Sequence, residues 1–137
     1  RRQWNLVDNK ELDYHYLGDF DHDMLGVLKS EKNINKTAVQ EIWHNDGDQI
    51  LAYMRGDLVF VFNFSPSRSY SDYGFLVPEG AYEVMLNTDS KLYGGNGLAD
   101  DTITHFTNSD KLYAKDHKGW LMLYIPARSA VVLRRKE

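Results

Sequence analysis

The sequence predicts a mainly β fold, a sandwich or barrel of about seven strands, preceded by a helical segment. Short apolar segments recur between turn residues over most of the 137-residue chain, which is the pattern of an all-β domain. Before them, apolar residues recur at the three- and four-residue spacing of one helix face. With 42% hydrophobic residues, the chain is long enough to form one domain with a buried core.

The helical pattern occupies the first part of the chain. Asp8 and Glu11, three residues apart, form a capping arrangement that predicts a helix start near Asp8. The apolar positions of the expected face are Leu12, Tyr16, Phe20, Met24, Leu25 and Leu28. Gly18 and Gly26 interrupt this face, so we expect one helix or two short ones. We therefore place a helical lead-in over residues 1–30 and an all-β domain over residues 31–137.

Two adjacent hairpins are expected next. Their strands are TAVQEIWHN (37–45), QILAYMR (49–55) and DLVFVFNF (57–64). Asp46-Gly47 predicts a tight turn in which the glycine supplies the positive φ, and Gly56 separates the second strand from the third. Residues 59–64 are apolar except for Asn63, which predicts a strand covered on both faces near the middle of the sandwich.

The remaining strands are expected at AYEVMLN (81–87), WLMLYIP (120–126) and SAVVLRR (129–135), with a weaker one at TITHFTN (102–108). The glycine-rich residues 93–101 lie between strands and are expected to form a loop. Residues 66–73, rich in serine and tyrosine, are also expected to form a loop, with its turn capped by Ser69, Ser71 and Asp72.

These two loops supply the candidate site residues, which are Tyr70, Asp72, Tyr73 and Tyr93. Tyrosine combines a flat apolar ring with a hydroxyl, so it suits a sugar-binding surface and a domain interface equally well. Both interpretations stay open, and we favour the domain interface for residues 66–73. Trp43 and Trp120 lie in expected strands, where core or cross-strand packing is the usual role of an aromatic side chain.

The composition argues against several classes of partner. The formal charge of −4 comes from 16 basic and 20 acidic residues spread along the chain, which argues against nucleic acid. No apolar segment approaches the roughly 20 residues that span a bilayer, and no stretch resembles a signal peptide, so we expect no membrane partner. The chain has no cysteine, which is compatible with the cytoplasm that we expect as its compartment.

No catalytic or metal site is expected. Asp19, Asp21 and Asp23 have the spacing of a calcium loop, but Met24 and Ser30 occupy the positions of its glycine and its bidentate acid. We therefore expect an acidic, solvated helix face. The five histidines include no pair at the i, i+4 spacing of a zinc site, and nucleophile and phosphate-binding motifs are absent from the sequence. No cofactor is implied.

Four ordered stretches resemble one family, the 1,4-α-glucan branching enzymes of the eukaryotic type. They are RRQWNLVDNKELDYHYLGDFDHDM, RGDLVFVFNFSPSRSYSDY, LNTDSKLYGGNG and YIPARSAVV. The resemblance implies a Greek-key β-sandwich of the α-amylase C-terminal-domain type, with residues 1–30 similar to the end of the catalytic (β/α)₈ barrel. It also implies that the barrel of the same polypeptide is the partner, with α-glucan as a further candidate.

The resemblance places the catalytic carboxylates upstream of this chain, so it carries no catalytic residue over. The implied function is that of a non-catalytic domain that braces a barrel, which transfers an α-1,4-glucan segment to a 6-hydroxyl. The family pattern has an arginine after SYSDY, whereas Gly74 stands here, so the resemblance carries over no ionic contact of that arginine. Two alternatives are a stand-alone carbohydrate-binding module and a protein-interaction domain.

Overall fold

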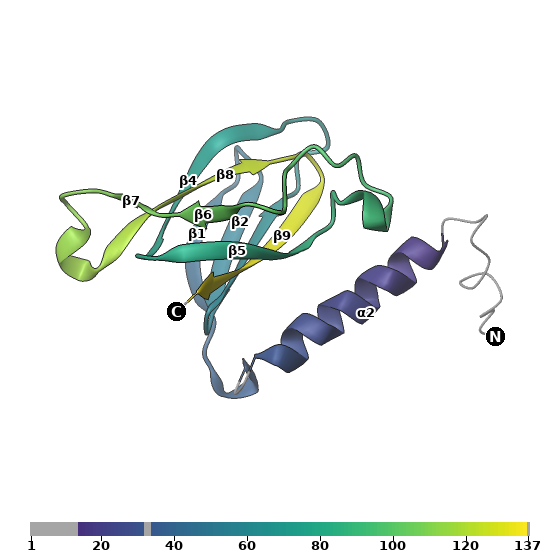
Figure 1. The fold of residues 1–137 in the computed structure, drawn as a ribbon. Coiled ribbons are helices and arrows are strands. Elements are labelled where there is room, and N and C mark those ends of the chain that lie inside the picture. Colours follow the sequence, from purple (N-terminus) through teal and green to yellow (C-terminus); the bar gives the residue numbers. More distant parts are fainter. Residues whose placement is uncertain (1–13, 32–33, 137) are drawn as a thin grey trace.

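The computed structural model describes residues 14–31 and 34–136. A helix, α2 (Tyr14–Ser30), precedes the strands, and short 3-10 turns lie at η1 (Ile34–Lys36), η2 (Lys91–Tyr93) and η3 (Ala114–Asp116) (Figure 1). The strands are β1 (Gln40–Asn45), β2 (Ile50–Arg55), β3 (Leu58–Asn63), β4 (Tyr70–Pro78), β5 (Ala81–Asn87), β6 (Thr104–Phe106), β7 (Asn108–Ser109), β8 (Lys118–Ile125) and β9 (Ser129–Lys136).

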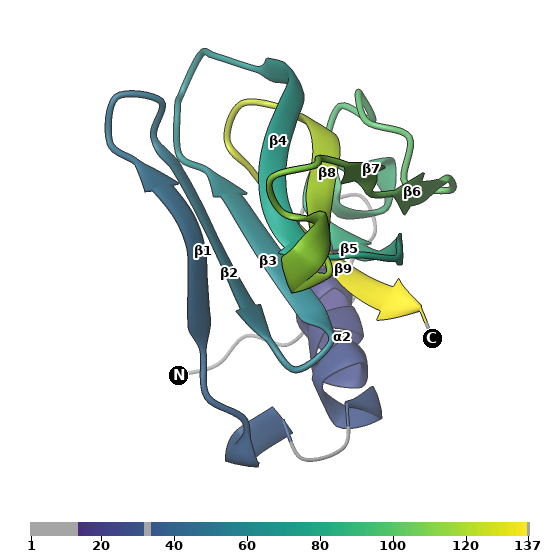
Figure 2. The same cartoon turned by 90° about the vertical axis from the view of Figure 1, so that its left-hand side faces the viewer.

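The strands form two packed antiparallel sheets, which confirms the predicted mainly β sandwich (Figure 2). The larger sheet has the order β1-β2-β3-β9-β5-β6, and the smaller has the order β4-β8-β7. The last strand, β9, returns to lie between β3 and β5, the long connection typical of a Greek key. The core between the sheets includes Val59, Val61, Phe75, Tyr82, Leu121 and Leu133.

The two hairpins are confirmed, but the chemistry of the first turn differs from the prediction. The turn spans residues 46–49, and its positive φ of 60° falls on Gln49 rather than on Gly47. Asn45 organises it instead, because its Oδ1 accepts a hydrogen bond from the Asp48 N–H at 2.9 Å. This four-residue connection closes through a side chain, so it does not need a glycine in the left-handed region.

The central strand β3 has two unequal faces. Val59 and Val61 are fully buried between the sheets, as predicted. Phe60 and Phe62 point to the outer face of the larger sheet and are only half-buried, and Phe64, just past the strand, is 59% exposed. The prediction that both faces of β3 are covered therefore holds fully only for the face toward the core.

The helix α2 runs without a break through Gly18 and Gly26, so the described part of the lead-in is one helix and not two. The predicted cap at Asp8 and Glu11 lies outside the described residues. At 17 residues, α2 is about 25 Å long. No helix within residues 14–31 and 34–136 combines the length and apolarity needed to cross a membrane.

The predicted loop of residues 66–73 is wrong in its second half. Tyr70 begins strand β4, which pairs with β8, and a bulge interrupts the pairing between Tyr70 and Tyr73. Asp72 in the bulge has a φ of 49°. The extra residue breaks the alternation of inward and outward side chains, and this is why the segment has the composition of a loop.

Candidate functional site

Tyr70 and Tyr73 lie together at the start of β4, with ring centroids 5.3 Å apart and tilted edge to face. The Tyr70 hydroxyl donates to the Asp48 backbone carbonyl at 2.9 Å. The Tyr73 hydroxyl donates to the Asp48 carboxylate at 2.9 Å and accepts from the Trp43 indole N–H at 3.0 Å. Burial raises the pKa of Tyr73 above its usual value.

We call these four residues, Tyr70, Tyr73, Asp48 and Trp43, the tyrosine clasp. The clasp joins β4 of the smaller sheet to β1 and the β1–β2 turn of the larger sheet. Both hydroxyls are therefore engaged within the β domain. Of the two predicted roles of Trp43, core or cross-strand packing, the core role does not hold, because its ring is 46% exposed.

The turn before the clasp is closed by other contacts than the predicted cap of Ser69, Ser71 and Asp72. Ser65 closes the turn instead, because its Oγ accepts from the Arg68 N–H at 2.9 Å. The Ser69 hydroxyl accepts from the distant Ala127 N–H at 3.0 Å. Asp72 is exposed in the bulge of β4. Asp72 faces solvent beside the clasp and is the candidate contact there.

Tyr93 lies elsewhere, in η2, where it packs against α2. Its ring meets the ring of Phe20 edge to face at 5.2 Å, and its hydroxyl donates to the Asp23 carboxylate. This hydrogen bond holds the pKa of Asp23 below its usual value, and burial raises the pKa of Tyr93. Asp19 and Asp21 are exposed on the same helix, and the described residues contain no group of three potential metal ligands.

The outer face of the larger sheet carries a feature that the sequence analysis missed. Phe60, Tyr53, Phe62 and Phe64 form what we call the aromatic row, with near-parallel neighbouring rings 4.8, 5.9 and 5.7 Å apart. Phenylalanine at every second position of residues 60–64 is the signal that could have revealed it. Since the inner residues of these strands fill the core, the row lies opposite the core, on the side of α2.

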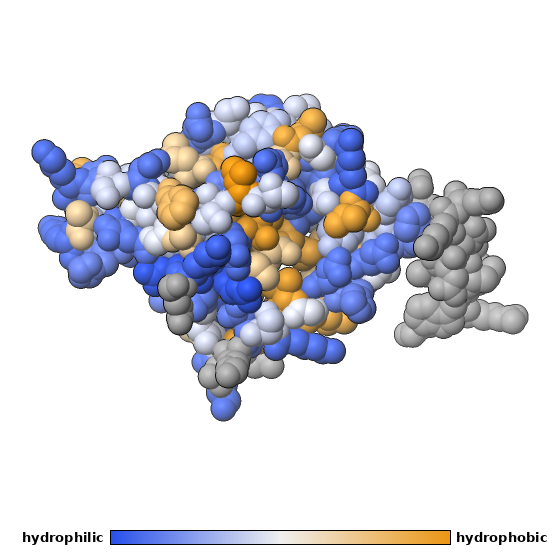
Figure 3. All heavy atoms as spheres, viewed as in Figure 1, coloured by the Kyte–Doolittle hydropathy of each residue, from blue (hydrophilic) through white to orange (hydrophobic). Residues whose placement is uncertain are grey.

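Between α2 and this face lies an apolar groove of about 400 Å³, which we call the α2 groove. Phe20, Met24 and Leu28 line it from the helix, and Tyr53, Phe60 and Phe62 line it from the sheet. Figure 3 shows apolar side chains gathered between the sandwich and the helix. The groove is open because the backbone of α2 contacts mainly β5 and η2 and leaves the outer face of β2 and β3 uncovered.

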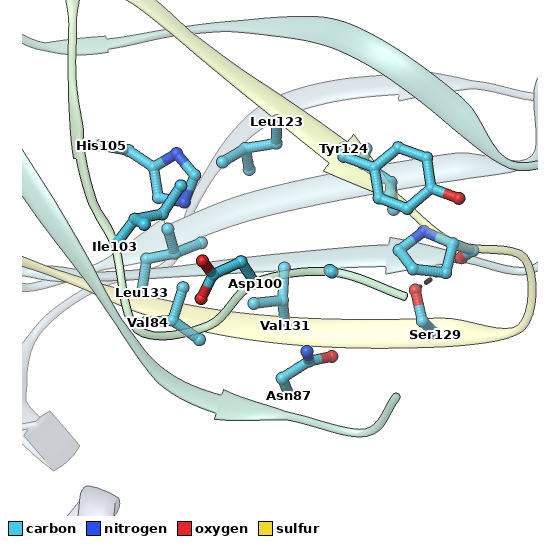
Figure 4. A pocket seen from close by; sticks show the side chains of 13 residues that line it. Val84, Asn87, Asp100, Ile103, His105, Leu123, Tyr124, Ser129, Val131 and Leu133 are labelled. Carbon is cyan, nitrogen blue, oxygen red and sulfur yellow. Dashed lines mark hydrogen bonds between the residues drawn. The ribbon is translucent and has the colours of Figure 1, made fainter. Parts of the chain in front are cut away.

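A smaller cavity of about 90 Å³ lies at the end of the sandwich that residues 98–105 cover. Its walls are mostly apolar, and the rings of His105 and Tyr124 border it together with Asp100 (Figure 4). Burial lowers the pKa of His105, and the charge of Asp100 opposes this effect only partly. The cavity therefore favours a neutral imidazole.

Comparison with known proteins places the whole chain within one group. Residues 42–136 match the family described as "Alpha amylase, C-terminal all-beta domain". The chain is 37% identical over 138 residues to the 1,4-alpha-glucan-branching enzyme of Saccharomyces cerevisiae, with 100% of the chain and 19% of that protein covered. It is 36% identical over 140 residues to the enzyme of the same name from Rhizophagus irregularis, with 97% of the chain and 19% of that protein covered.

A plant relative is also similar. The chain is 39% identical over 113 residues to the chloroplastic/amyloplastic 1,4-alpha-glucan-branching enzyme of Oryza sativa subsp. japonica, which covers 80% of the chain and 14% of that protein. The chain thus spans about a fifth of the length of the fungal relatives and less of the plant one.

Proposed function

Because this chain belongs to the α-amylase C-terminal all-β domain family, we propose that it is the non-catalytic C-terminal domain of a 1,4-α-glucan-branching enzyme. The observation that carries the proposal is the match of the full chain to 19% of a protein with that name. A segment of this size, with a core of its own, fits a supporting domain.

The chemistry of the parent then lies upstream. Transfer of an α-1,4-glucan segment to a 6-hydroxyl with retention needs a carboxylate nucleophile and a carboxylic acid facing one glycosidic bond. In this proposal the upstream (β/α)₈ barrel supplies both groups, and the β domain holds the barrel in its folded form. The proposed compartment is the cytoplasm, with which the lack of cysteine is compatible.

We propose that residues 1–30 belong to the barrel and residues 31–137 to the β domain, with Tyr93 as a contact between them. The support is the packing of Tyr93 on Phe20 and its hydrogen bond to Asp23 of α2. Tyr70 and Tyr73 act within the β domain as part of the tyrosine clasp, which holds its two sheets together. Asp72, exposed beside them, is the candidate for a glucan contact.

The aromatic row argues against the alternative of a stand-alone carbohydrate-binding module. A pyranose ring stacks on a free aromatic face. In the row, Tyr53 and Phe62 each stack on two neighbouring rings, and the end rings each stack on one. Parallel stacking buries faces and presents edges, which suits packing against apolar side chains better than sugar binding.

The test compares this chain with the full-length polypeptide that contains it, each incubated with amylose. We expect the full-length polypeptide to lower the iodine staining and to form α-1,6 linkages that isoamylase releases, while the chain alone does neither. A full-length polypeptide that forms no α-1,6 linkages would refute the proposed parent. Branching by the purified chain alone would refute its non-catalytic role.

A further inference from the structure

The α2 groove is an open apolar surface within the described part of the chain. The helix α2 forms one wall of the groove, and the strands β2 and β3 of the larger sheet form the other. Val39, which lines it, is 56% exposed. An open apolar groove between a helix and a sheet marks a contact surface.

We propose that the α2 groove seats an amphipathic helix from the part of the same polypeptide that precedes residue 1. This inference rests on the proposed function, because it takes the chain to be the C-terminal part of a longer protein. It goes further by naming the surface that receives the upstream part and the kind of segment that fits it.

The groove restricts the chemistry of its occupant. Arg55 is the one ionisable cation among its lining residues, and its Nε already donates to the Thr37 carbonyl at 2.9 Å. The lining therefore offers apolar carbon and few polar partners, so the occupant has to present an apolar face. The strands β2 and β3 are paired on both sides within the sheet, so an added strand finds no free edge.

A helix meets these requirements because its backbone groups are satisfied internally and one face can be apolar. Such a helix would lie beside α2 on the outer face of the sheet and complete a layer of helices there. Leu17 and Leu25 of α2 are 67% and 51% exposed, so α2 itself has apolar surface left for an additional neighbour.

The upstream part of the polypeptide is favoured over a second copy because of its tether. Relatives of this chain are about five times longer, since the match covers only 19% of their length. The upstream residues enter through α2, which is one wall of the groove, so they are held at high effective concentration beside it. A second copy has no such advantage.

The experiment places the photoreactive residue p-benzoylphenylalanine at position 39 of the full-length polypeptide, because Val39 lines the groove and is exposed. The matched control carries it at position 106, because Phe106 is also exposed, at 71%, but lies on β6 at the far edge of the larger sheet. We expect illumination to cross-link position 39 to a helix upstream of residue 1, in a several-fold higher yield than position 106 gives. Mixing isotope-labelled and unlabelled protein separates cross-links within one chain from those between two chains.

Three results would overturn the inference. They are cross-links from position 39 only between chains, a yield no higher than at position 106, or a cross-link yield that rises above that of position 106 only when maltoheptaose is added. The branching assay on the same protein keeps the proposals apart. Normal branching without the cross-link from position 39 refutes the seated helix alone, and a cross-linked groove without branching refutes the proposed parent alone.

Discussion

At the scale of single residues, His105 links the small cavity to pH. Its folded-state pKa is lowered by burial, so the unfolded chain binds a proton more readily than the folded chain as the pH falls below about 6.5. The contribution of the neutral imidazole to stability is thus fully present above that pH. It is lost as the pH falls through the folded-state pKa.

We expect His105→Asn to reduce the loss of unfolding free energy between about pH 7.5 and about pH 5, because the substituted side chain does not titrate. Urea denaturation of the chain at the two pH values measures this loss. The matched control is His117→Asn, since His117 is exposed and asparagine tolerates its left-handed backbone. An equal loss of stability in the His105→Asn variant and the parent would contradict the prediction.

Asp72 carries backbone strain in the bulge of β4. Its φ of 49° lies in the region that aspartate tolerates and β-branched residues avoid. We expect Asp72→Val to lower the unfolding free energy by about 1–2 kcal/mol. Ser71→Val serves as the control, because Ser71 is also exposed but has no positive φ, and there the change is expected to stay within about 0.5 kcal/mol. Similar effects at both positions would show that the bulge is not strained.

At the scale of elements, α2 is attached to the sandwich at one end more firmly than along its length. Its backbone contacts η2 and β5, and the groove separates it from β2 and β3. The strand β3, by contrast, is paired on both sides and buried on one face. Elements with few buried contacts open at lower free energy than the core of the same molecule.

In the isolated chain we expect the amides of α2 to exchange faster than those of β3, and Tyr93→Phe to accelerate the exchange of α2 further. The reason is the loss of the hydroxyl that donates to Asp23. Tyr113→Phe is the control, since Tyr113 also packs edge to face on another ring, that of Trp120, away from α2. Hydrogen exchange with mass spectrometry gives both rates. Protection of α2 equal to that of β3 would show that the helix is held by more than η2 and β5.

The elements that sequence reasoning predicted correctly are those whose signal is local. β2, β3, β5 and β9 alternate or form apolar segments between clear turn residues, so their existence follows from composition. The whole of β4 escaped, because the bulge at its start breaks the alternation and the residues there are serine and aspartate, which indicated a loop. The clasp and the α2 groove depend on residues more than twenty positions apart, and no local spacing reveals such contacts.

At the scale of the whole molecule, the clasp joins the two sheets at the edge formed by β1 and β4. Three hydrogen bonds of 2.9 to 3.0 Å connect Tyr70, Tyr73, Trp43 and Asp48. Each of these bonds contributes about 0.5–1.5 kcal/mol, and the bond to the carboxylate is at the upper end of the scale. The sequence suggested an interface between domains for these tyrosines. Their hydroxyls connect two sheets of one domain, and a contact of this edge with another domain stays a prediction.

The double substitution Tyr70→Ala/Tyr73→Ala tests whether the two tyrosines stabilise the domain or contact glucan. It removes two half-buried rings and all three hydrogen bonds, so we expect the unfolding free energy of the isolated chain to fall by at least about 3 kcal/mol. The full-length polypeptide should lose thermal stability as well, because the weakened domain is part of it. Its mobility in a native amylopectin gel should stay unchanged below the new unfolding temperature, since neither hydroxyl is free for a sugar. Tyr124→Ala, on β8 outside the clasp, is the control for removing a partly exposed ring. Unchanged stability together with faster migration in the gel would instead show that this edge of the sandwich contacts glucan, and that the clasp is incidental to its function.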